Sequence, residues 1–285
     1  MTTVVAVDGV LADGANARIS VLDRGFLYGD SVYEVVRTYR GRAFLLDEHL
    51  ARLERSASLL GIPLPLPLRA QGDEIARVLA AATNAESYIR VIITRGNGPI
   101  GLDPALATNP TRVVIVTELQ GFPAELYERG AAICLVPAGR SAASAIPQGA
   151  KSGNYLVNIM ALGVARRRGA HEAVMLDAAG LITEGASSNV FVVSAGALHT
   201  PPLHSGILEG ITRRKVIELA RSAGIEVRER ELTPSDLKQA DEVFLTSTLR
   251  EILPVTTIDG ERVAGGAPGP TTQRLRDLYR ALTAR

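Results

Sequence analysis

A single lysine stands apart from other charged residues in the segment "AIPQGAKSGNYLVNIM". Lys151 lies between small residues, and an apolar helical pattern begins shortly after it. Partial burial and the positive end of a helix dipole both disfavour an ammonium ion, so both lower the pKa of a lysine in such a place. A neutral amine can attack a carbonyl carbon and form a Schiff base. Lys151 is therefore a candidate nucleophile, although a lone lysine is more commonly a solvated surface residue.

Two further segments have residues suited to a phosphorylated aromatic cofactor. In "LITEGASSNVFVV", Glu184 precedes small residues and an apolar strand. A carboxylate there could hold a proton on a ring nitrogen, so that the ring withdraws electrons. In "LEGITRRKVIELA", Ile211 and Thr212 open a helix, and the free N–H groups of a helix start bind phosphate well. Each segment also has an ordinary interpretation. Glu184 could be a turn residue, and Ile211 and Thr212 could simply belong to a helix cap.

Additional phosphate donors occur at two other places. Arg52, in "DEHLARLERS", could bind a phosphate through two parallel hydrogen bonds or could be solvated on its helix. The hydroxyl run Thr246-Ser247-Thr248 lies at the end of a predicted strand. A Schiff-base lysine, a glutamate for a ring nitrogen and several phosphate donors are together the requirements of pyridoxal 5'-phosphate.

The composition limits the class of protein. The chain has 285 residues, 46% of them hydrophobic and 21% charged, which is typical of a globular protein with one large or two ordinary domains. The net charge of +1 gives no strong field for nucleic acid or an anionic membrane. A single cysteine, Cys134, excludes internal disulfides and multi-cysteine zinc sites. The start "MTTVVAVDGV" is not that of a signal peptide, and no apolar run is long enough to span a membrane. We therefore expect a cytoplasmic protein.

Other patterns in the sequence indicate neither a dinucleotide-binding site nor a metal site. The run "GNGPIG" (96–101) matches the dinucleotide-binding pattern, but Pro104 and Pro110 stand where that pattern requires a helix. We interpret it as a turn or active-site loop. The sequence contains no H-E-x-x-H and no histidine pair at ligand spacing, so we expect no metal.

The hydrophobic pattern predicts mixed helices and strands without regular βαβ alternation, which favours a two-domain α+β fold. Helices are predicted over 47–61, 72–82, 211–224 and 271–284, and after Lys151. Strands are predicted over 4–9, 17–25, 87–96, 111–119, 131–137, 171–177, 188–196, 225–231 and 242–248, with two more around a Gly-Arg turn in 33–46. We expect a small N-terminal domain (1–119), a linker (120–130) and a large cofactor-binding domain (131–285).

In this combination the motifs resemble the class IV aminotransferases, the fold-type IV pyridoxal-phosphate enzymes. The resemblance covers nearly the whole chain, and its segments are "DRGFLYGDSVYEVVRTYRGRAFLLDEHLARL", "AKSGNYLVN", "TEGASSNVF", "GILEGITR" and "TSTLREILPV". The family comprises D-amino-acid and branched-chain aminotransferases, (R)-selective amine transaminases and aminodeoxychorismate lyases. The resemblance implies an enzyme that acts on an amino donor and a 2-oxo acid, and a homodimer with sites at the domain interface.

The resemblance also implies a role for individual residues. Lys151 would bind the cofactor as a Schiff base and carry the proton of the reaction, and Glu184 would pair with the pyridine nitrogen. The phosphate would be held by Arg52, Ile211, Thr212 and Thr248. Leu208 would pack on the cofactor ring, Ser187 and Ser188 would lie nearby, and Tyr33 would line the substrate side.

The substrate is less directly indicated. The segment "YGDSVYEVVRTYRG" is closer to the D-amino-acid enzymes, but Ile100 and Leu102 stand where the defining D-specific enzymes have a carboxylate-binding arginine and histidine. Arg90 stands where those enzymes have a tyrosine of the same carboxylate site. On a strand, Arg90 shares a face with apolar Ile92, so it needs an anion, either a substrate carboxylate or a structural one.

We therefore expect a D-amino-acid aminotransferase of a variant carboxylate-binding type. A branched-chain L-amino-acid aminotransferase, an (R)-amine transaminase and an aminodeoxychorismate lyase remain as alternatives.

Overall fold

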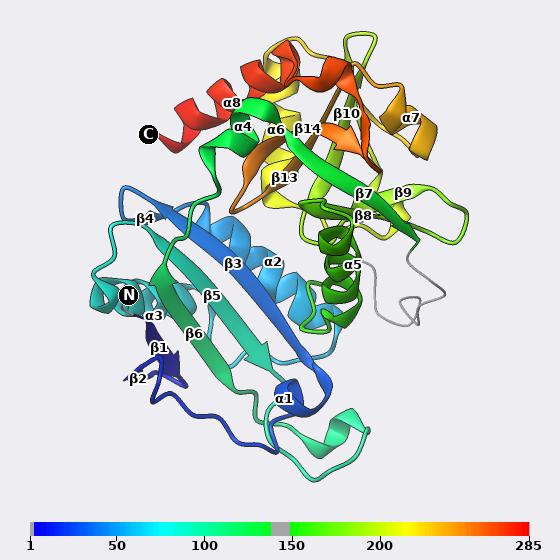
Figure 1. Ribbon diagram of the computed structural model, residues 1–285. Helices are drawn as coiled ribbons and strands as arrows, with labels where there is room; N and C mark the ends of the chain where they lie inside the picture. The colour runs from blue at the N-terminus through cyan, green and yellow to red at the C-terminus, as the bar shows by residue number, and fades with distance from the viewer. Residues whose placement is uncertain (1–2, 138–148, 285) are drawn as a thin grey trace. The chain divides into compact units, whose positions relative to one another are not determined.

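A computed structural model describes residues 3–137 and 149–284. Contacts between Cα atoms divide the chain into two compact units. The first consists of Met1–Gln120 together with Ala150–Tyr155, and the second of Gly121–Gly149 together with Leu156–Arg285. The first unit takes blue to cyan-green colours along most of its length in Figure 1, and the second takes green to red.

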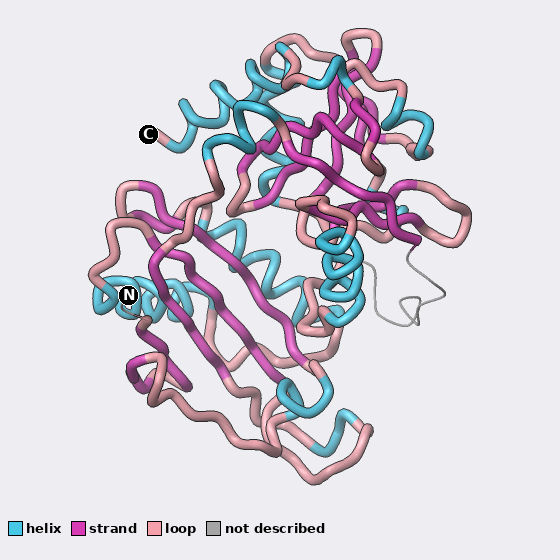
Figure 2. Tube along the Cα trace, in the orientation of Figure 1, coloured by secondary structure: helices cyan, strands magenta, loops and turns pink. Residues whose placement is uncertain are grey.

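The described part of the first unit contains a six-stranded antiparallel sheet in the order β2-β1-β6-β5-β3-β4. Figure 2 shows its longest strands side by side. The strands are β1 (Val4–Val7), β2 (Val10–Asp13), β3 (Ser31–Tyr39), β4 (Arg42–Ala43), β5 (Ser87–Thr94) and β6 (Arg112–Glu118). The helices are α1 (Arg24–Tyr28), α2 (Leu46–Leu59), α3 (Leu68–Ala82) and a short 3₁₀ turn, η1 (Pro104–Leu106).

The two faces of this sheet differ because side chains alternate along a strand. Val32 and Val36 of β3 are buried in a core with Leu50 and Leu53 of α2. Ile75 of α3 belongs to the same core, so the two long helices cover this face. The odd-numbered residues of β3 lie on the opposite face, which carries the predicted substrate-side residue.

Most predicted elements of this unit are confirmed, and two differ. The predicted strand over 17–25 is wrong: Asp23 is fully buried and its Oδ1 accepts the Gly25 N–H at 2.8 Å, which starts the short helix α1. Asp is a favoured helix N-cap, and this bond replaces strand pairing. The second long helix begins at Leu68 rather than Gly72.

The second unit, as far as it is described, has a nine-stranded sheet in the order β12-β11-β10-β13-β14-β7-β8-β9, with β15 beside β14. The pairs β11–β12, β14–β7 and β7–β8 are parallel. The strands are β7 (Ala131–Pro137), β8 (Glu172–Leu176), β9 (Ile182–Gly185), β10 (Asn189–Ser194), β11 (Ala197–Thr200), β12 (Val227–Glu229), β13 (Glu242–Ser247), β14 (Glu251–Ile258) and β15 (Glu261–Arg262). The helices are α4 (Ala124–Arg129), α5 (Leu156–Arg167), α6 (Ile211–Ser222), α7 (Pro234–Lys238) and α8 (Pro270–Thr283), with 3₁₀ turns η3 (Leu203–Ser205) and η4 (Ala264–Gly266).

Central strands of the second sheet are buried on both faces. Val190 and Val192 of β10 pack in a core with Leu245 and Val255. On the other face, Phe191 stacks on Phe244 with ring centroids 4.9 Å apart. Such strands read as continuous apolar runs, which is why "NVFVV" is recognisable in the sequence.

The region predicted as a linker contains α4, which packs against β14. Residues 150–155 belong to the first unit by their contacts, whereas the predicted large domain (131–285) includes them. The cause is local hydrogen bonding, since Ser152 forms an isolated antiparallel bridge with Val32 of β3.

Candidate active site

The backbone around Lys151 is fixed to β3 and α2. The N–H of Tyr33 donates to the carbonyl oxygen of Lys151 at 3.1 Å, and the N–H of Lys151 donates to Ser56 Oγ at 3.1 Å. Two residues later, the N–H of Gly153 donates to the carbonyl oxygen of Ser31 at 2.7 Å. A Cβ at position 153 would overlap Ser31 Oγ, so a larger residue there would require the Ser31 side chain to move. The main chain of the lysine is therefore held on both sides.

The side chain of Lys151 lies near two tyrosine rings. Its Nζ is 4.5 Å from the centroid of the Tyr33 ring and 5.8 Å from that of Tyr155. Burial, together with the neighbouring Tyr155, raises the pKa of the Tyr33 phenol well above its usual range. Tyr33 therefore remains protonated at physiological pH.

Arg90 meets the same tyrosine. Its guanidinium carbon lies 4.1 Å from the centroid of the Tyr33 ring, within the range of a cation–π interaction. The pairing of β3 with β5 explains this contact, because Tyr33 is opposite Ile92 and Arg90 is its diagonal neighbour on one face. Nη1 of Arg90 also lies 3.4 Å from the Tyr88 hydroxyl. Within 3–137 and 149–284, no carboxylate forms an ion pair with Arg90. The structure thus brings together Lys151, Tyr33 and Arg90.

Arg52 lies on α2 and has a buried carboxylate partner. Its Nε and Nη2 donate to Oε1 and Oε2 of Glu34 at 2.6 and 2.8 Å, and His49 Nδ1 lies 2.7 Å from the same Oε2. Burial alone would raise the pKa of Glu34, but the ion pair with Arg52 and the His49 hydrogen bond outweigh it and lower that pKa to about 2. Glu34 is therefore ionised, and it fixes the plane of the Arg52 guanidinium.

The predicted specificity residues Ile100 and Leu102 are 78% and 80% exposed. Arg24 holds the main chain of their loop. Its Nη1 donates to the carbonyl oxygen of Gly101 at 2.7 Å, and its Nη2 donates to that of Leu102 at 3.2 Å. The loop therefore presents both apolar side chains outward.

In the second unit, Glu184 is held by groups of the neighbouring loop. Its Oε2 accepts the Leu208 N–H at 3.0 Å and an Asn189 side-chain N–H at 3.3 Å. Asn189 also donates to the Leu208 carbonyl oxygen at 3.0 Å. This arrangement fixes the carboxylate next to the residue predicted to pack on the cofactor ring.

The start of α6 lies beside Asn189. Gly210 is the N-cap, and no side chain of the described residues caps the helix. A Cβ at Gly210 would overlap Asn189 Oδ1, so a larger residue there would displace the Asn189 side chain. Ile211 and Thr212, which open the helix, are buried.

A buried hydroxyl on the adjacent strand has no partner in the described part of the chain. Thr246 Oγ1 forms no hydrogen bond, and Thr246 lies opposite Asn189 in the β10–β13 register. Thr248 follows in a half-buried turn. An uncapped helix start with an unsatisfied hydroxyl nearby is suited to an anion such as a phosphate.

The turn at 185–188 is tightly built. Ser187 Oγ donates to Glu172 Oε2 at 2.8 Å and accepts from Arg250 Nη1 at 2.7 Å. Ser188 Oγ is buried without a hydrogen-bond partner among the described residues. A Cβ at Gly185 would overlap that same oxygen.

The predicted residues thus fall into two groups. The first unit holds Tyr33, Arg52, Arg90, Ile100, Leu102 and Lys151, and the second holds Glu184, Ser187, Ser188, Leu208, Ile211, Thr212 and Thr248. Sequence reasoning missed the residues that position them, namely Glu34, Ser56, Glu172, Asn189 and Arg250. Only Asn189 had a local signal, since it directly follows the two serines.

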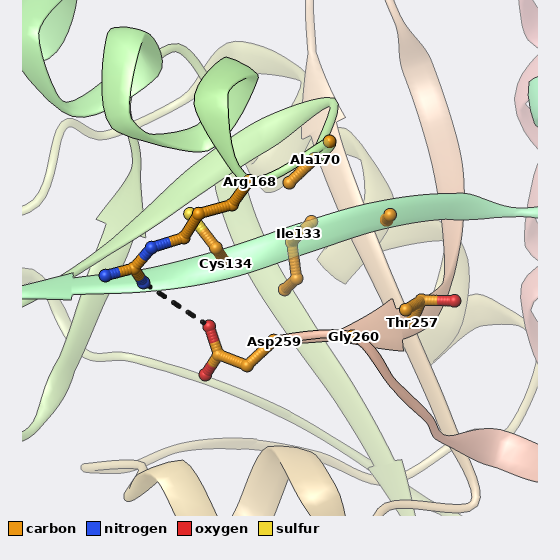
Figure 3. Close-up of a pocket in the computed structure, with 9 residues that line it drawn as sticks. Ile133, Cys134, Arg168, Ala170, Thr257, Asp259 and Gly260 are labelled. Atoms are coloured by element: carbon orange, nitrogen blue, oxygen red, sulfur yellow. Dashed lines mark ion pairs between the residues drawn. The ribbon is translucent and has the colours of Figure 1, made fainter.

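A separate cavity of about 600 Å³ lies in the second unit, where β7 meets the end of α5 and the end of β14 (Figure 3). Cys134 is buried at its wall, and burial raises the pKa of that thiol. An ion pair of Arg168 with Asp259 lies at 3.9 Å. None of the predicted site residues lines this cavity, so we assign no step of the reaction to it.

Comparison with known proteins defines the class. The family model for "Amino-transferase class IV" matches residues 31–258. The chain is 36% identical over 279 residues to the branched-chain-amino-acid aminotransferase of Escherichia coli (strain K12), with 95% of this chain and 90% of the relative covered. It is 35% identical over 272 residues to the D-alanine aminotransferase of Bacillus licheniformis, with 95% and 94% covered.

The fold agrees with these matches. A crystal structure of the E. coli branched-chain amino acid aminotransferase superposes with a TM-score of 0.94 at 33% identity and covers 99% of this chain and 95% of that one. The two-sheet α+β architecture is that of the fold-type IV enzymes, which confirms the predicted fold class. The chain belongs to the class IV aminotransferases. No helix in the described ranges is long and apolar enough to cross a membrane.

Class IV aminotransferases use pyridoxal 5'-phosphate, and the residues present fit this group. A fixed carboxylate (Glu184), an uncapped helix start (Ile211) and an unsatisfied buried hydroxyl (Thr246) lie around one loop of the second unit. When bound, the cofactor supplies an aldehyde that accepts the amino group and a ring that withdraws electrons.

Proposed function

We propose that this aminotransferase takes D-amino acids as amino donors and that Arg90 binds their α-carboxylate. The observation that carries the role of Arg90 is its setting: it is half-buried, its guanidinium lies on the ring of Tyr33, and no carboxylate of the described chain neutralises it. Lys151 Nζ contacts the same ring. A guanidinium in such a place is well suited to bind a planar carboxylate through two hydrogen bonds. The preference for D-amino acids is supported by the segment "YGDSVYEVVRTYRG", which resembles the D-amino-acid enzymes.

The other site residues have proposed roles toward the reacting groups. Lys151 would hold the cofactor covalently until the substrate amine takes its place, and its freed Nζ would then carry the proton that leaves the substrate α-carbon. Glu184 keeps the ring nitrogen protonated, which makes the ring a stronger electron sink. The phosphate is held by Arg52, the N–H groups of Ile211 and Thr212, and Thr248.

A branched-chain L-amino-acid aminotransferase is the second candidate. It is favoured by the TM-score of 0.94 to the E. coli enzyme and by the 36% identity to its sequence. The D-alanine aminotransferase is matched at 35% identity over a similar length. Because these identities differ by so little, the substrate has to be decided by the side chains of the site.

A panel of amino donors tests the proposal. The purified holoenzyme is mixed with D-alanine, D-glutamate, L-leucine, L-valine or an (R)-arylalkylamine, and the absorbance of the cofactor is followed without any acceptor. We expect fast conversion by D-amino acids and none by L-leucine. Conversion by L-leucine together with inertness toward D-alanine would replace this proposal with the branched-chain one.

The role of Arg90 is tested with Arg90→Met. Loss of a charge-assisted pair to a carboxylate should raise the KM for D-amino acids about 10- to 100-fold and leave the rate with a plain amine unchanged. Arg37→Met is a matched control, because Arg37 is a half-buried arginine on β3 that lies over Tyr39 in the same way. If Arg90→Met weakens amines and amino acids equally, Arg90 does not bind the carboxylate.

We also propose that the protein acts as a homodimer. Large apolar side chains are exposed on both units: Val21, Phe26, Ile100 and Leu102 in the first, and Leu156, Ile159 and Met160 in the second. Exposed apolar groups of this size are typical of a surface that another protein covers. Sedimentation at several concentrations gives the mass, and a monomer at the concentrations of the assay contradicts the proposal.

A further inference from the structure

Two turns of the second unit lie at the same end of β10 and β13. The turn 185–188 leads into β10, and the turn 247–250 leads out of β13. Asn189 and Thr246 face each other in the antiparallel register, so the turn before Asn189 and the turn after Thr246 are neighbours. The first turn carries Ser187, and the second carries Thr248.

One guanidinium joins these turns. Arg250 Nη1 lies 2.7 Å from Glu172 Oε2 and 2.7 Å from Ser187 Oγ, while Ser187 Oγ donates to the same carboxylate oxygen at 2.8 Å. The three atoms form a closed triangle. The main chain of Arg250 is fixed as well, since its N–H donates to Ser247 Oγ at 3.2 Å and its carbonyl oxygen accepts the Tyr127 hydroxyl at 3.1 Å.

Glu172 is the anchor of this network. It is the first residue of β8 and fully buried, and its Oε1 accepts the Ala173 N–H at 3.1 Å. A buried carboxylate requires a cation, and Arg250, which is 9% exposed, provides it.

The backbone directly after the 247–250 turn is strained. Glu251, the next residue, has a φ of 58°, in the left-handed region that side-chain-bearing residues rarely occupy. Such a conformation persists only where tertiary contacts impose it. The link from Arg250 to Glu172 is a contact of this kind.

We infer that Arg250, anchored by Glu172, is a positioning residue that presets the 247–250 turn for the phosphate of the cofactor. The inference rests on the proposed role of Thr248 as a phosphate ligand. Holding the turn in its binding conformation removes an ordering cost that would otherwise weaken every interaction made by Thr248. Ser187 receives its hydroxyl orientation from the same triangle.

The test compares two ligands that differ only in the phosphate. Cofactor-free full-length chain is titrated with pyridoxal 5'-phosphate and with pyridoxal, and the ratio of the two dissociation constants gives the phosphate preference. Arg250→Met should lower this preference about tenfold, the effect of one charge-assisted hydrogen bond. The affinity for pyridoxal itself should change less than about twofold, because the phosphate is the only group affected.

Three further variants make the result decisive. Arg112→Met is the matched control: Arg112 is a buried arginine of the first unit that also pairs with a buried carboxylate, Glu74, and its loss should leave the preference unchanged. Arg250→Lys keeps the charge but has a shorter side chain that places its nitrogen less well between Glu172 and Ser187. It should therefore fold even if Arg250→Met does not, and should give an intermediate preference. Thr248→Ala tests the underlying phosphate role.

The outcomes distinguish the phosphate role of Thr248 from the positioning role of Arg250. If Thr248→Ala leaves the preference unchanged, the proposed role of Thr248 fails, and the positioning role fails with it. If Thr248→Ala lowers the preference while both Arg250 variants retain it, Thr248 binds the phosphate and the positioning role of Arg250 is overturned. Equal losses for pyridoxal and its phosphate in the Arg250 variants indicate a structural role only, which also overturns the inference.

Discussion

Replacement of the buried carboxylate in the first unit should destabilise the protein in a pH-dependent way. Glu34 is fully buried and makes the ion pair with Arg52 and the hydrogen bond with His49. The substitution Glu34→Gln keeps the shape and one acceptor but removes the charge, and so leaves the Arg52 guanidinium buried without its carboxylate. Removal of one partner of a buried ion pair costs about 3–5 kcal/mol.

The lowered pKa of Glu34 gives a second value for the stabilisation that its charge provides. A fall from 4.5 to about 2 on folding corresponds to about 3 kcal/mol of stabilisation by the ionised form. Since the pKa is lowered in the folded state, this stabilisation is fully present above pH 4.5 and is lost as the pH falls toward 2. The two values agree, so we expect a difference of about 3 kcal/mol between the wild type and Glu34→Gln at pH 7.

Urea unfolding of the cofactor-free chain measures this difference at pH 7, 5, 4 and 3. The difference in free energy of unfolding should shrink across the acid range, because the wild type loses the contribution of Glu34 while the variant has none to lose. Two units can unfold separately, so hydrogen exchange of amides in β3 and α2 assigns the transition to the first unit. A difference below about 1 kcal/mol at pH 7, or one that does not change with pH, refutes this reasoning.

Three other substitutions have equally direct outcomes. Lys151→Ala should abolish transamination and the absorbance of the covalently bound cofactor, and appreciable turnover would remove Lys151 from its proposed role. Gly153→Ala should lower the melting temperature and the rate together, because the new Cβ overlaps Ser31 Oγ next to the lysine; unchanged values would show that the segment can shift. Phe191→Ala should cost about 3–5 kcal/mol in urea unfolding through the cavity left against Phe244, and a cost below about 1 kcal/mol would show that this stack is not part of a tight core.

Much of the secondary structure follows from local pattern alone. The helical spacing of leucines gives α2, and the alternation in "SYIRVII" gives β5. The same alternation places Arg90 on the face that also carries Tyr33, once the two strands pair. Strand β14 is missed because Pro254 lies inside it, and proline argues against a central strand. The pairing of β14 with β7 begins at Val255, so Pro254 lies outside that ladder.

For the candidate site, too, some features follow from local sequence pattern and others from tertiary packing. The sequence by itself predicted the chemistry, because a secluded Lys151, a Glu184 before small residues and a helix that starts after Gly210 are local patterns with a direct chemical meaning. Only the tertiary structure decided which groups hold them. Glu34 meets Arg52 because β3 packs against α2, and Arg250 meets Glu172 across 78 residues of chain. Contacts of this kind depend on the packing of distant segments, and no spacing within the sequence encodes them.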